Sequence, residues 1–307
     1  MTELSPPFAR YQSIIDDWEG FQDSLTRPLP TCIWANPLKT SPEELEALLR
    51  QESISFQPLS WRPGAYRLLN TPRPGNRIAA VAGLYQIQEE VSMLPLELMD
   101  LHPGQRVLDT CAAPGNKTAQ IAAALGNTGT LLANDRSFHR LKPLGRALDR
   151  LGIYNTSVMI CDAANFPASI GTFDRILADV PCSCEGTSRK KLQAREATAD
   201  DFRSLCNMQT AILRRSLELL RPGGRLVYST CTFAPEENEA IIDAVLRDFS
   251  LPLEVLPARI EGFPATPGLV EWRGRQFDPR LERTLRVYPH QHDTGGFFLA
   301  VLERPGS

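Results

Sequence analysis

The sequence predicts an α/β protein whose main sheet is mostly parallel, preceded by a small α+β domain. From residue 106 onward, short apolar stretches alternate regularly with longer helix-like stretches. Several of the short stretches end abruptly at an aspartate, as a buried parallel strand does. Prolines crowd the region before residue 75, which indicates a loop-rich first domain. Alternating strands and helices build one sheet with its ligand site at the carboxyl ends of the strands.

Residues 1–75 are expected to form the small first domain, and residues 76–307 the larger one. The first domain should open with an amphipathic helical segment and a short strand, at residues 1–30 and 31–34. Ser41 is then the expected N-cap of a helix, with Pro42 at its first position and Glu44 closing a capping box.

The larger domain has the element order of a Rossmann-like methyltransferase. Its main strands are expected at residues 106–109, 130–135, 157–162, 175–179 and 225–232. Its helices are expected at residues 118–124, 138–151, about 200–220 and 235–248. Two late strands, at 284–288 and 297–302, are joined through a Gly-Gly turn, so we expect them to pair antiparallel at one edge.

Composition excludes several classes of protein. The 307 residues are 42% hydrophobic, enough for one large core and a smaller domain. The sequence has no 18-residue apolar run and a polar start, so we expect a cytoplasmic protein without a membrane partner. We also expect the protein to act as a monomer. Seven scattered cysteines argue against a disulfide framework. Cys182 and Cys184 are too close for a CxxC knuckle, so we expect no metal.

The net charge of −3 does not by itself indicate a nucleic-acid partner, but basic residues are clustered. One cluster is Arg189, Lys190, Lys191 and Arg195, and another is Arg273, Arg275, Arg280, Arg283 and Arg286. Such patches follow phosphate backbones in some proteins and are solvated surface in others. We expect the 189–191 run to contact a phosphate backbone.

Residues 106–124, RVLDTCAAPGNKTAQIAAA, combine a strand, a turn of small residues and a helix. A turn of this kind leaves backbone N–H groups free at the helix N-terminus, where a carboxylate or phosphate binds. The turn is not GxGxxG, so the dinucleotide fingerprint is absent. An ordinary strand-to-helix turn remains an equal alternative from these residues alone.

Asp135, Asp162 and Asp179 end three successive strands. Acids at these positions can accept hydrogen bonds from the hydroxyl and amino groups of a ligand. Asp135 follows the small-residue turn by one strand–helix unit, where a ribose acceptor belongs. Asp162 taken alone also fits a helix N-cap. The three acids together favour a cofactor that carries a nucleoside.

Two cysteines lie at the ends of further strands, Cys182 after the fourth and Cys231 at the end of the fifth. A single cysteine is most often a small buried apolar residue. Two at the ligand-binding edge favour chemistry, because a thiolate attacks electron-poor carbon. Cytosine C6 is such a carbon, and attack there makes C5 nucleophilic toward a methyl donor. A second thiol can then assist loss of the C5 proton and release of the enzyme.

With these motifs the chain resembles the NOL1/NOP2/sun family of S-adenosylmethionine-dependent RNA cytosine-C5 methyltransferases. The resemblance covers about residues 80–304. The matching segments are GLYQIQEEVSMLP (83–95), LDTCAAPGNKT (108–118), ADVPCSCEG (178–186), YSTCT (228–232) with EENE (236–239), and residues 288–302. WANP at 34–37 is similar, more loosely, to the family's small N-terminal RNA-binding module.

The resemblance implies S-adenosylmethionine as cofactor, RNA as partner, and a role for each motif. Cys231 would be the nucleophile, Cys182 the partner in release, and Asp179 the group that holds the N3/N4 edge of cytosine. Asp135 would accept the ribose hydroxyls and Asp162 the adenine amino group. The cofactor contacts implied are Cys111, Ala112, Ala113, Pro114, Gly115, Asn116, Lys117, Asp135, Arg140, Asp162 and Asp179. For Lys117 and Arg140, the alternative role of binding neighbouring phosphates stays open.

Two residues depart from the family pattern, and several functions stay open. Asn116 and Cys184 each stand where the family usually has glycine, and Cys184 adds a third thiol near the site. Ribosomal RNA is the leading substrate, with tRNA as the alternative and a non-catalytic RNA-binding scaffold as the non-enzymatic one. DNA cytosine-C5 methylation fits less well, because those enzymes attack from the Pro-Cys motif. Methylation of an exocyclic amine lacks its (D/N)PPY motif.

Overall fold

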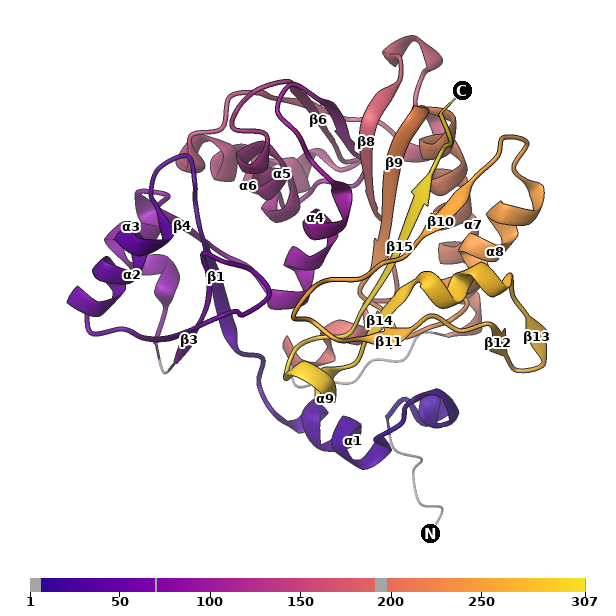
Figure 1. Ribbon diagram of the computed structural model, residues 1–307, viewed down its shortest axis with the longest axis horizontal. Coiled ribbons are helices and arrows are strands. Elements are labelled where there is room, and N and C mark those ends of the chain that lie inside the picture. The colour runs from indigo at the N-terminus through magenta and orange to yellow at the C-terminus, as the bar shows by residue number, and fades with distance from the viewer. Residues whose placement is uncertain (1–6, 70, 191–197, 307) are drawn as a thin grey trace.

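The computed structural model describes residues 7–69, 71–190 and 198–306, which form a small antiparallel sheet and a large mixed sheet (Figure 1). The small sheet has the order β2 (Ser55–Pro58), β3 (Ala65–Leu69), β1 (Thr31–Ala35), β4 (Tyr85–Ile87). Its helices are α2 (Pro42–Gln51) and α3 (Ile78–Val81). Strand β4 lies past residue 75, where the sequence suggests the end of the first domain.

Helix α2 begins as the sequence predicts. The Ser41 hydroxyl accepts from the Glu44 N–H at 3.2 Å, and the Glu44 carboxylate accepts from the Ser41 N–H at 2.8 Å. This reciprocal pair satisfies two N–H groups that the start of a helix leaves without partners.

The N-terminal helical segment packs on the large domain. It consists of the 3-10 helix η1 (Ala9–Ile14) and of α1 (Trp18–Thr26), and α1 contacts α9 (Pro289–His292). The Phe21 ring lies edge-on to Phe233 and Tyr288, with ring centres 5.3 and 6.4 Å apart. This segment therefore belongs to the large domain in space, although it precedes the small sheet in the chain.

The large sheet confirms the predicted mostly parallel layout. Five parallel strands run in the order β7 (Thr156–Met159), β6 (Thr130–Asn134), β5 (Arg106–Asp109), β8 (Phe173–Asp179), β9 (Leu220–Thr230). The antiparallel strands are β15 (Phe297–Glu303), β14 (Leu285–Val287), β11 (Thr266–Pro267) and β10 (Glu254–Leu256). The antiparallel part is larger than the predicted edge, because β10 and β11 extend the late pair. Strands of two or three residues are too short to show an alternating pattern.

Helices α4 (Leu94–Met99), α5 (Asn116–Ala124), α6 (Phe138–Leu151), α7 (Ala199–Glu218) and α8 (Glu239–Asp248) complete the domain. The short 3-10 helices are η2 (Pro74–Asn76), η3 (Glu90–Met93), η4 (Ala163–Asn165), η5 (Ala168–Ile170), η6 (Glu185–Lys190) and η7 (Pro279–Arg283), and β12 (Glu271–Trp272) pairs with β13 (Arg275–Gln276). Helix α6 has the predicted bounds. Helix α8 begins later than predicted, because the residues before it form a turn that holds the site described below.

Among the residues placed by the structure, no helix is both long and apolar enough to cross a membrane.

Neighbouring residues on each central strand point to opposite faces of the sheet and enter different cores. On β9, Val227 packs in the core that contains α4 and α5, whereas Leu226 and Tyr228 pack in the core beneath α7 and α8. The first core also holds Trp34 and Trp61 of the small domain, so the two domains share buried surface. Strands β6 and β7 are added on one side of β5, and β8 and β9 on its other side, so the direction of the strand order reverses between β5 and β8. Ligands bind beside such a switch point.

Candidate active site

The carboxyl ends of β5, β8 and β9 border a cavity of about 260 Å³. The predicted site residues that line it are Cys111, Ala112, Ala113, Pro114, Asn116, Lys117, Arg140, Asp179, Cys182 and Cys231. Asp135 and Asp162 line an adjoining cavity, which Cys111 and Arg140 also border. The fold thus gathers the residues that the sequence motifs single out over more than 100 positions.

The turn between β5 and α5 is shaped by Gly115. Its φ is +109°, and a Cβ there would lie 3.0 Å from Leu144 Cα, so glycine is required. The next residue, Asn116, begins α5 with ordinary helical geometry, and its side chain accepts a 2.6 Å hydrogen bond from Gln86. Asparagine therefore replaces the family's glycine here without backbone strain.

Asp109, the last residue of β5, lies beneath this turn. It accepts a 2.7 Å hydrogen bond from the Thr118 hydroxyl, and burial raises its pKa to about 7. The carboxyl group ties the strand end to the first turn of α5.

Asp135 fits the ribose acceptor that the resemblance implies. Its Oδ1 accepts from the Ser137 N–H at 2.9 Å, while its Oδ2 is buried, without a hydrogen bond, and 3.2 Å from Arg140 Nη1. A buried carboxylate oxygen with spare capacity suits a ligand hydroxyl. Arg140 also donates to the Ala113 carbonyl at 2.9 Å, which links this acid to the small-residue turn.

Asp162 caps the short helix η4, as its alternative interpretation predicts. Its carboxylate accepts from the Ala164 N–H at 3.1 Å and from Asn165 Nδ2 at 2.7 Å. It nevertheless lines the same small cavity as Asp135. Capping leaves lone pairs free on each oxygen, so the geometry is compatible with both roles.

Asp179 is fixed by two partners inside the cavity. Its Oδ2 lies 2.7 Å from Lys117 Nζ, and its Oδ1 accepts a 2.7 Å hydrogen bond from the Ser229 hydroxyl. Burial lowers the pKa of Lys117, but the neighbouring Asp179 raises it by more, so the ammonium stays charged. The motifs leave Lys117 open between cofactor and phosphate, and they do not reveal Ser229 as a partner.

Three thiols meet at the ends of β8 and β9. Cys182 Sγ lies 3.4 Å from Cys231 Sγ and 4.0 Å from Cys184 Sγ. Cys184 reaches this position with a φ of +60°, the left-handed region that favours glycine. The sequence spacing of Cys182 and Cys184 does not predict this cluster, since Cys231 joins it from another strand.

The thiols perturb one another. Hydrogen bonds with Cys184 and Cys231, together with burial, raise the pKa of Cys182. The hydrogen bond with Cys182 lowers the pKa of Cys231, but Cys184, burial and Asp179 raise it by more. The pKa of Cys184 is lowered, because the other two thiols hydrogen-bond to its sulfur. The cluster therefore holds one thiolate readily and resists forming a second.

The EENE segment positions both cysteine loops. Glu237 accepts from the Ser183 N–H at 3.0 Å and from Gln209 at 2.7 Å, and Asn238 accepts from Thr230 at 2.6 Å. Asn238 also donates to the Thr232 carbonyl at 3.1 Å. These buried contacts hold the 182–184 loop and the end of β9 side by side. The motif signals these positioning residues, but not which loop each one holds.

The expected RNA contact at residues 189–191 is wrong for Arg189. Its guanidinium is buried and donates to the carbonyls of Arg27, Pro28 and Thr294 at 2.8–3.0 Å, with Asp293 at 2.6 Å. It therefore anchors the chain around the N-terminal segment. Lys190 is half-exposed, pairs with Glu89 at 2.6 Å and borders the active-site cavity. Lys191 and Arg195 lie outside the described residues.

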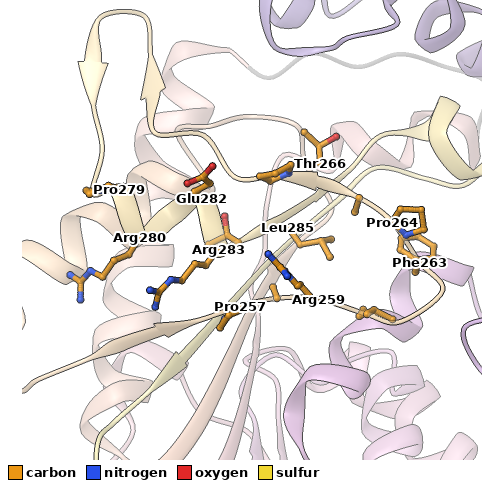
Figure 2. A pocket seen from close by; sticks show the side chains of 15 residues that line it. Pro257, Arg259, Phe263, Pro264, Thr266, Pro279, Arg280, Glu282, Arg283 and Leu285 are labelled. Atoms are coloured by element: carbon orange, nitrogen blue, oxygen red, sulfur yellow. The ribbon is translucent and has the colours of Figure 1, made fainter.

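In the second basic cluster, the arginines divide into buried and exposed. Arg286 is buried and paired with Glu239, so it belongs to the core. Arg280 is held by Asp278 at 2.7 Å. Figure 2 shows Arg280 and Arg283 along a cavity of about 810 Å³, which Arg259 also borders. This cavity adjoins β14, where Leu285 pairs with Leu299 of β15. Leu299 pairs in turn with Ser229, near the end of β9.

Comparison with known proteins shows the family of this chain. The model of the 16S rRNA methyltransferase RsmB/F family matches residues 96–303, and that of the N-terminal domain of 16S rRNA methyltransferase RsmF matches residues 7–90. The chain belongs to this family. It is an S-adenosylmethionine-dependent RNA cytosine-C5 methyltransferase.

Among relatives, the tRNA (cytosine(49)-C(5))-methyltransferase of Pyrococcus abyssi is 34% identical, over 95% of this chain and 94% of that enzyme. Ribosomal RNA small subunit methyltransferase F of Salmonella paratyphi C is 36% identical, over 94% of this chain. The chain spans 60% of that bacterial enzyme and 34–35% of the human and mouse 28S rRNA enzymes.

Solved structures share the fold of this chain. A methyltransferase homolog protein from Pyrococcus horikoshii has a TM-score of 0.83 and 33% identity, over 93% of this chain and 90% of that one. NSun6 from Pyrococcus horikoshii, solved with SFG, has a TM-score of 0.82 at 23% identity, over 94% of both chains.

Proposed function

We propose that this chain methylates C5 of a cytosine in RNA through a covalent bond between Cys231 and C6. The observation that carries the proposal is the pair of thiols 3.4 Å apart at the ends of β8 and β9, in one cavity with Asp179. S-adenosylmethionine supplies an electrophilic methyl group when bound. The binding residues proposed for it are the 111–117 turn and Arg140, with Asp135 for the ribose and Asp162 for the adenine. Asp179 is proposed to contact both the cofactor and the cytosine.

The residues of the cavity divide the work. Attack by the Cys231 sulfur on C6, with its proton passing to N3, removes the aromaticity of the ring and makes C5 nucleophilic. Asp179 accepts hydrogen bonds from the N3/N4 edge and stabilises the protonated adduct, while Lys117 and Ser229 fix its orientation. After methylation at C5, Cys182 assists removal of the C5 proton, and the Cys231 thiolate leaves as the ring regains aromaticity.

Ribosomal RNA is the substrate that we propose first. Both family models matched by the chain, over residues 7–90 and 96–303, describe 16S rRNA methyltransferases. A tRNA substrate is the second candidate, because the archaeal tRNA relative matches over nearly its whole length. We further propose that the protein acts as a cytoplasmic monomer and that its first domain, expected at residues 1–75 and extended in the structure to β4, contributes to RNA binding.

Bisulfite sequencing of total RNA from cells with and without this protein tests the proposal. The expected result is the loss of one or a few unconverted cytosines, located in rRNA, when the gene is removed. Loss confined to tRNA would select the second candidate. Identical maps from both cells would contradict the proposed function.

A further inference from the structure

The three-thiol cluster of Cys182, Cys184 and Cys231 is more than the proposed reaction needs. That reaction uses the thiols of Cys182 and Cys231, whereas Cys184 has no step in it. Yet all three sulfur atoms lie within 4.8 Å of one another. We propose that the cluster is a binding site for a thiophilic metal ion such as Zn²⁺, and that occupancy of this site switches the enzyme off.

The sulfur separations suit such an ion. Zn²⁺ binds thiolates at about 2.3 Å in tetrahedral sites, which places the sulfurs about 3.8 Å apart. The observed separations of 3.4 Å and 4.0 Å bracket this value. The third separation, between the sulfurs of Cys184 and Cys231, is no more than 4.8 Å.

The backbone supports the same assignment. The φ of Cys184 is +60°, a conformation that a cysteine adopts at a cost and that glycine adopts freely. In this conformation its sulfur lies 4.0 Å from that of Cys182. The loops that carry the other two sulfurs are held by Glu237 and Asn238, so the cluster is organised before a metal arrives.

The surrounding charge is compatible with the occupied site. Three thiolates and one divalent cation carry a net charge of −1. The ammonium groups of Lys117 and Lys190 border the same cavity and offset part of that charge, although each is also paired with a carboxylate, Asp179 and Glu89 respectively. The fourth coordination position of the metal faces the cavity, where water can fill it.

Inhibition follows from the identity of the ligands, and this part rests on the proposed function. A Cys231 sulfur that donates its electron pair to a metal cannot attack C6 of cytosine. A Cys182 sulfur in the same state cannot accept the C5 proton. RNA cytosine and the metal ion would therefore exclude each other.

Cys184→Gly is the variant that separates metal binding from catalysis. Glycine suits a φ of +60°, so the fold is expected to persist. Cys206→Ser is the matched control, because Cys206 lies on α7 and its sulfur donates to the Glu236 carbonyl instead of joining the cluster. Metal-free protein, kept reduced by a phosphine, is titrated with Cd²⁺ while the ultraviolet charge-transfer band between thiolate and metal is recorded.

The wild type and Cys206→Ser should show a band that saturates at one equivalent of Cd²⁺. In Cys184→Gly the dissociation constant should rise at least tenfold, and the saturated band should lose about a third of its intensity, as one of three thiolates is gone. A wild type without the band, or a Cys184→Gly variant that titrates like the wild type, would overturn the metal site.

The switch is tested by methyl transfer to RNA with increasing Zn²⁺. Half-inhibition of the wild type should require at least tenfold less Zn²⁺ than that of Cys184→Gly, when each rate is expressed relative to that of the same protein without metal. Equal sensitivity would overturn the switch. If neither protein transfers methyl groups although the Cd²⁺ band depends on Cys184, the metal site stands and the proposed function falls.

Discussion

At the scale of single residues, the site depends on side chains whose partners come from distant parts of the chain. Asp179 is oriented by Lys117 from the α5 turn and by Ser229 from β9. Asp135 is paired with Arg140 from α6. Each acid therefore has a defined orientation before any ligand binds, which reduces the entropy lost on binding.

Replacing Cys231 by alanine should abolish methyl transfer and leave cofactor affinity unchanged, because the thiol faces the base. The fold should persist, since the hydrogen bond from the Gly186 N–H to the backbone carbonyl of residue 231, at 2.9 Å, does not involve the thiol. Radiolabelled methyl transfer and calorimetry measure the two quantities. Retained turnover would place the nucleophile elsewhere, with Cys182 tested next.

Replacing Asp135 by alanine should weaken cofactor binding by about 1–3 kcal/mol, the cost of losing a charge-assisted acceptor. Arg140 is half-exposed, so water can solvate it when its partner is gone. Asp135→Asn keeps one acceptor oxygen and should lose less. An unchanged dissociation constant in calorimetry for Asp135→Ala would remove Asp135 from the ribose site.

At the scale of elements, the loops after β8 and β9 are held by a buried acidic network. Glu185 accepts from the Tyr11 hydroxyl at 2.7 Å and from Thr232 at 3.2 Å. Burial raises the pKa of Glu185 to about 7, and the nearby Glu237 adds to the shift. The folded state therefore binds a proton at this position more tightly than the unfolded chain does.

Stability should depend on pH through this residue. Because the pKa of Glu185 is higher in the folded state, its contribution is complete below about pH 4 and is lost as the pH rises through 7. Glu185→Gln removes the ionisation, so its stability relative to the wild type should improve from pH 5 to pH 8, by at most about 3 kcal/mol. Urea denaturation at several pH values measures the difference. Glu261→Gln, at an exposed position, is the control. A difference between Glu185→Gln and the wild type that stays constant with pH would refute this role.

The sequence predicts the regular elements well and the irregular ones poorly. Helix α6 has a long apolar stripe, and α2 carries a complete capping box, so both are visible locally. Strands β10 and β11 have two or three residues and owe their existence to pairing with β15 and β14. A local pattern cannot reveal such strands.

For the site, the motifs name the residues but not all of their environments. The sequence identifies Cys182 and Cys231 as candidates for catalysis, together with the acids at the strand ends. It does not reveal that Arg189 is buried, because its acceptors lie about residues 27 and 294, more than 100 positions away. It places Cys184 near the site as a third thiol, but it does not reveal how close the three sulfur atoms lie, since Cys184 approaches through a left-handed backbone conformation.

At the scale of the whole molecule, the small domain, the N-terminal segment and the catalytic sheet share buried contacts. Arg189 and the aromatic cluster around Phe21 fasten the N-terminal segment to the large domain. The arginine-bordered cavity of Figure 2 adjoins β14, whose Leu285 lines it. The exposed arginines along this cavity make it a candidate surface for the RNA backbone.

RNA affinity should depend on Arg259 and Arg283, both exposed along that cavity. Their joint replacement by alanine should weaken RNA binding and reduce the log–log salt slope by up to about 1.5 units, roughly 0.7 for each phosphate that is no longer neutralised. Arg221→Ala is the control, because Arg221 lies at the start of β9, away from the active-site end of that strand. A slope equal to that of the wild type would identify the two arginines as solvated surface.

The covalent mechanism is tested most directly by trapping its intermediate. If Cys182 assists loss of the C5 proton, Cys182→Ala should still form the bond between Cys231 and C6 and accept the methyl group, and then stall. The measurement is a denaturing gel of the variant incubated with RNA and S-adenosylmethionine. It is run in both the Cys184 and Cys184→Gly backgrounds, because Cys184 lies 4.0 Å from Cys182. The account predicts a slow-migrating protein–RNA band that disappears in the Cys182→Ala, Cys231→Ala double variant. Normal turnover without that band in both backgrounds would contradict it.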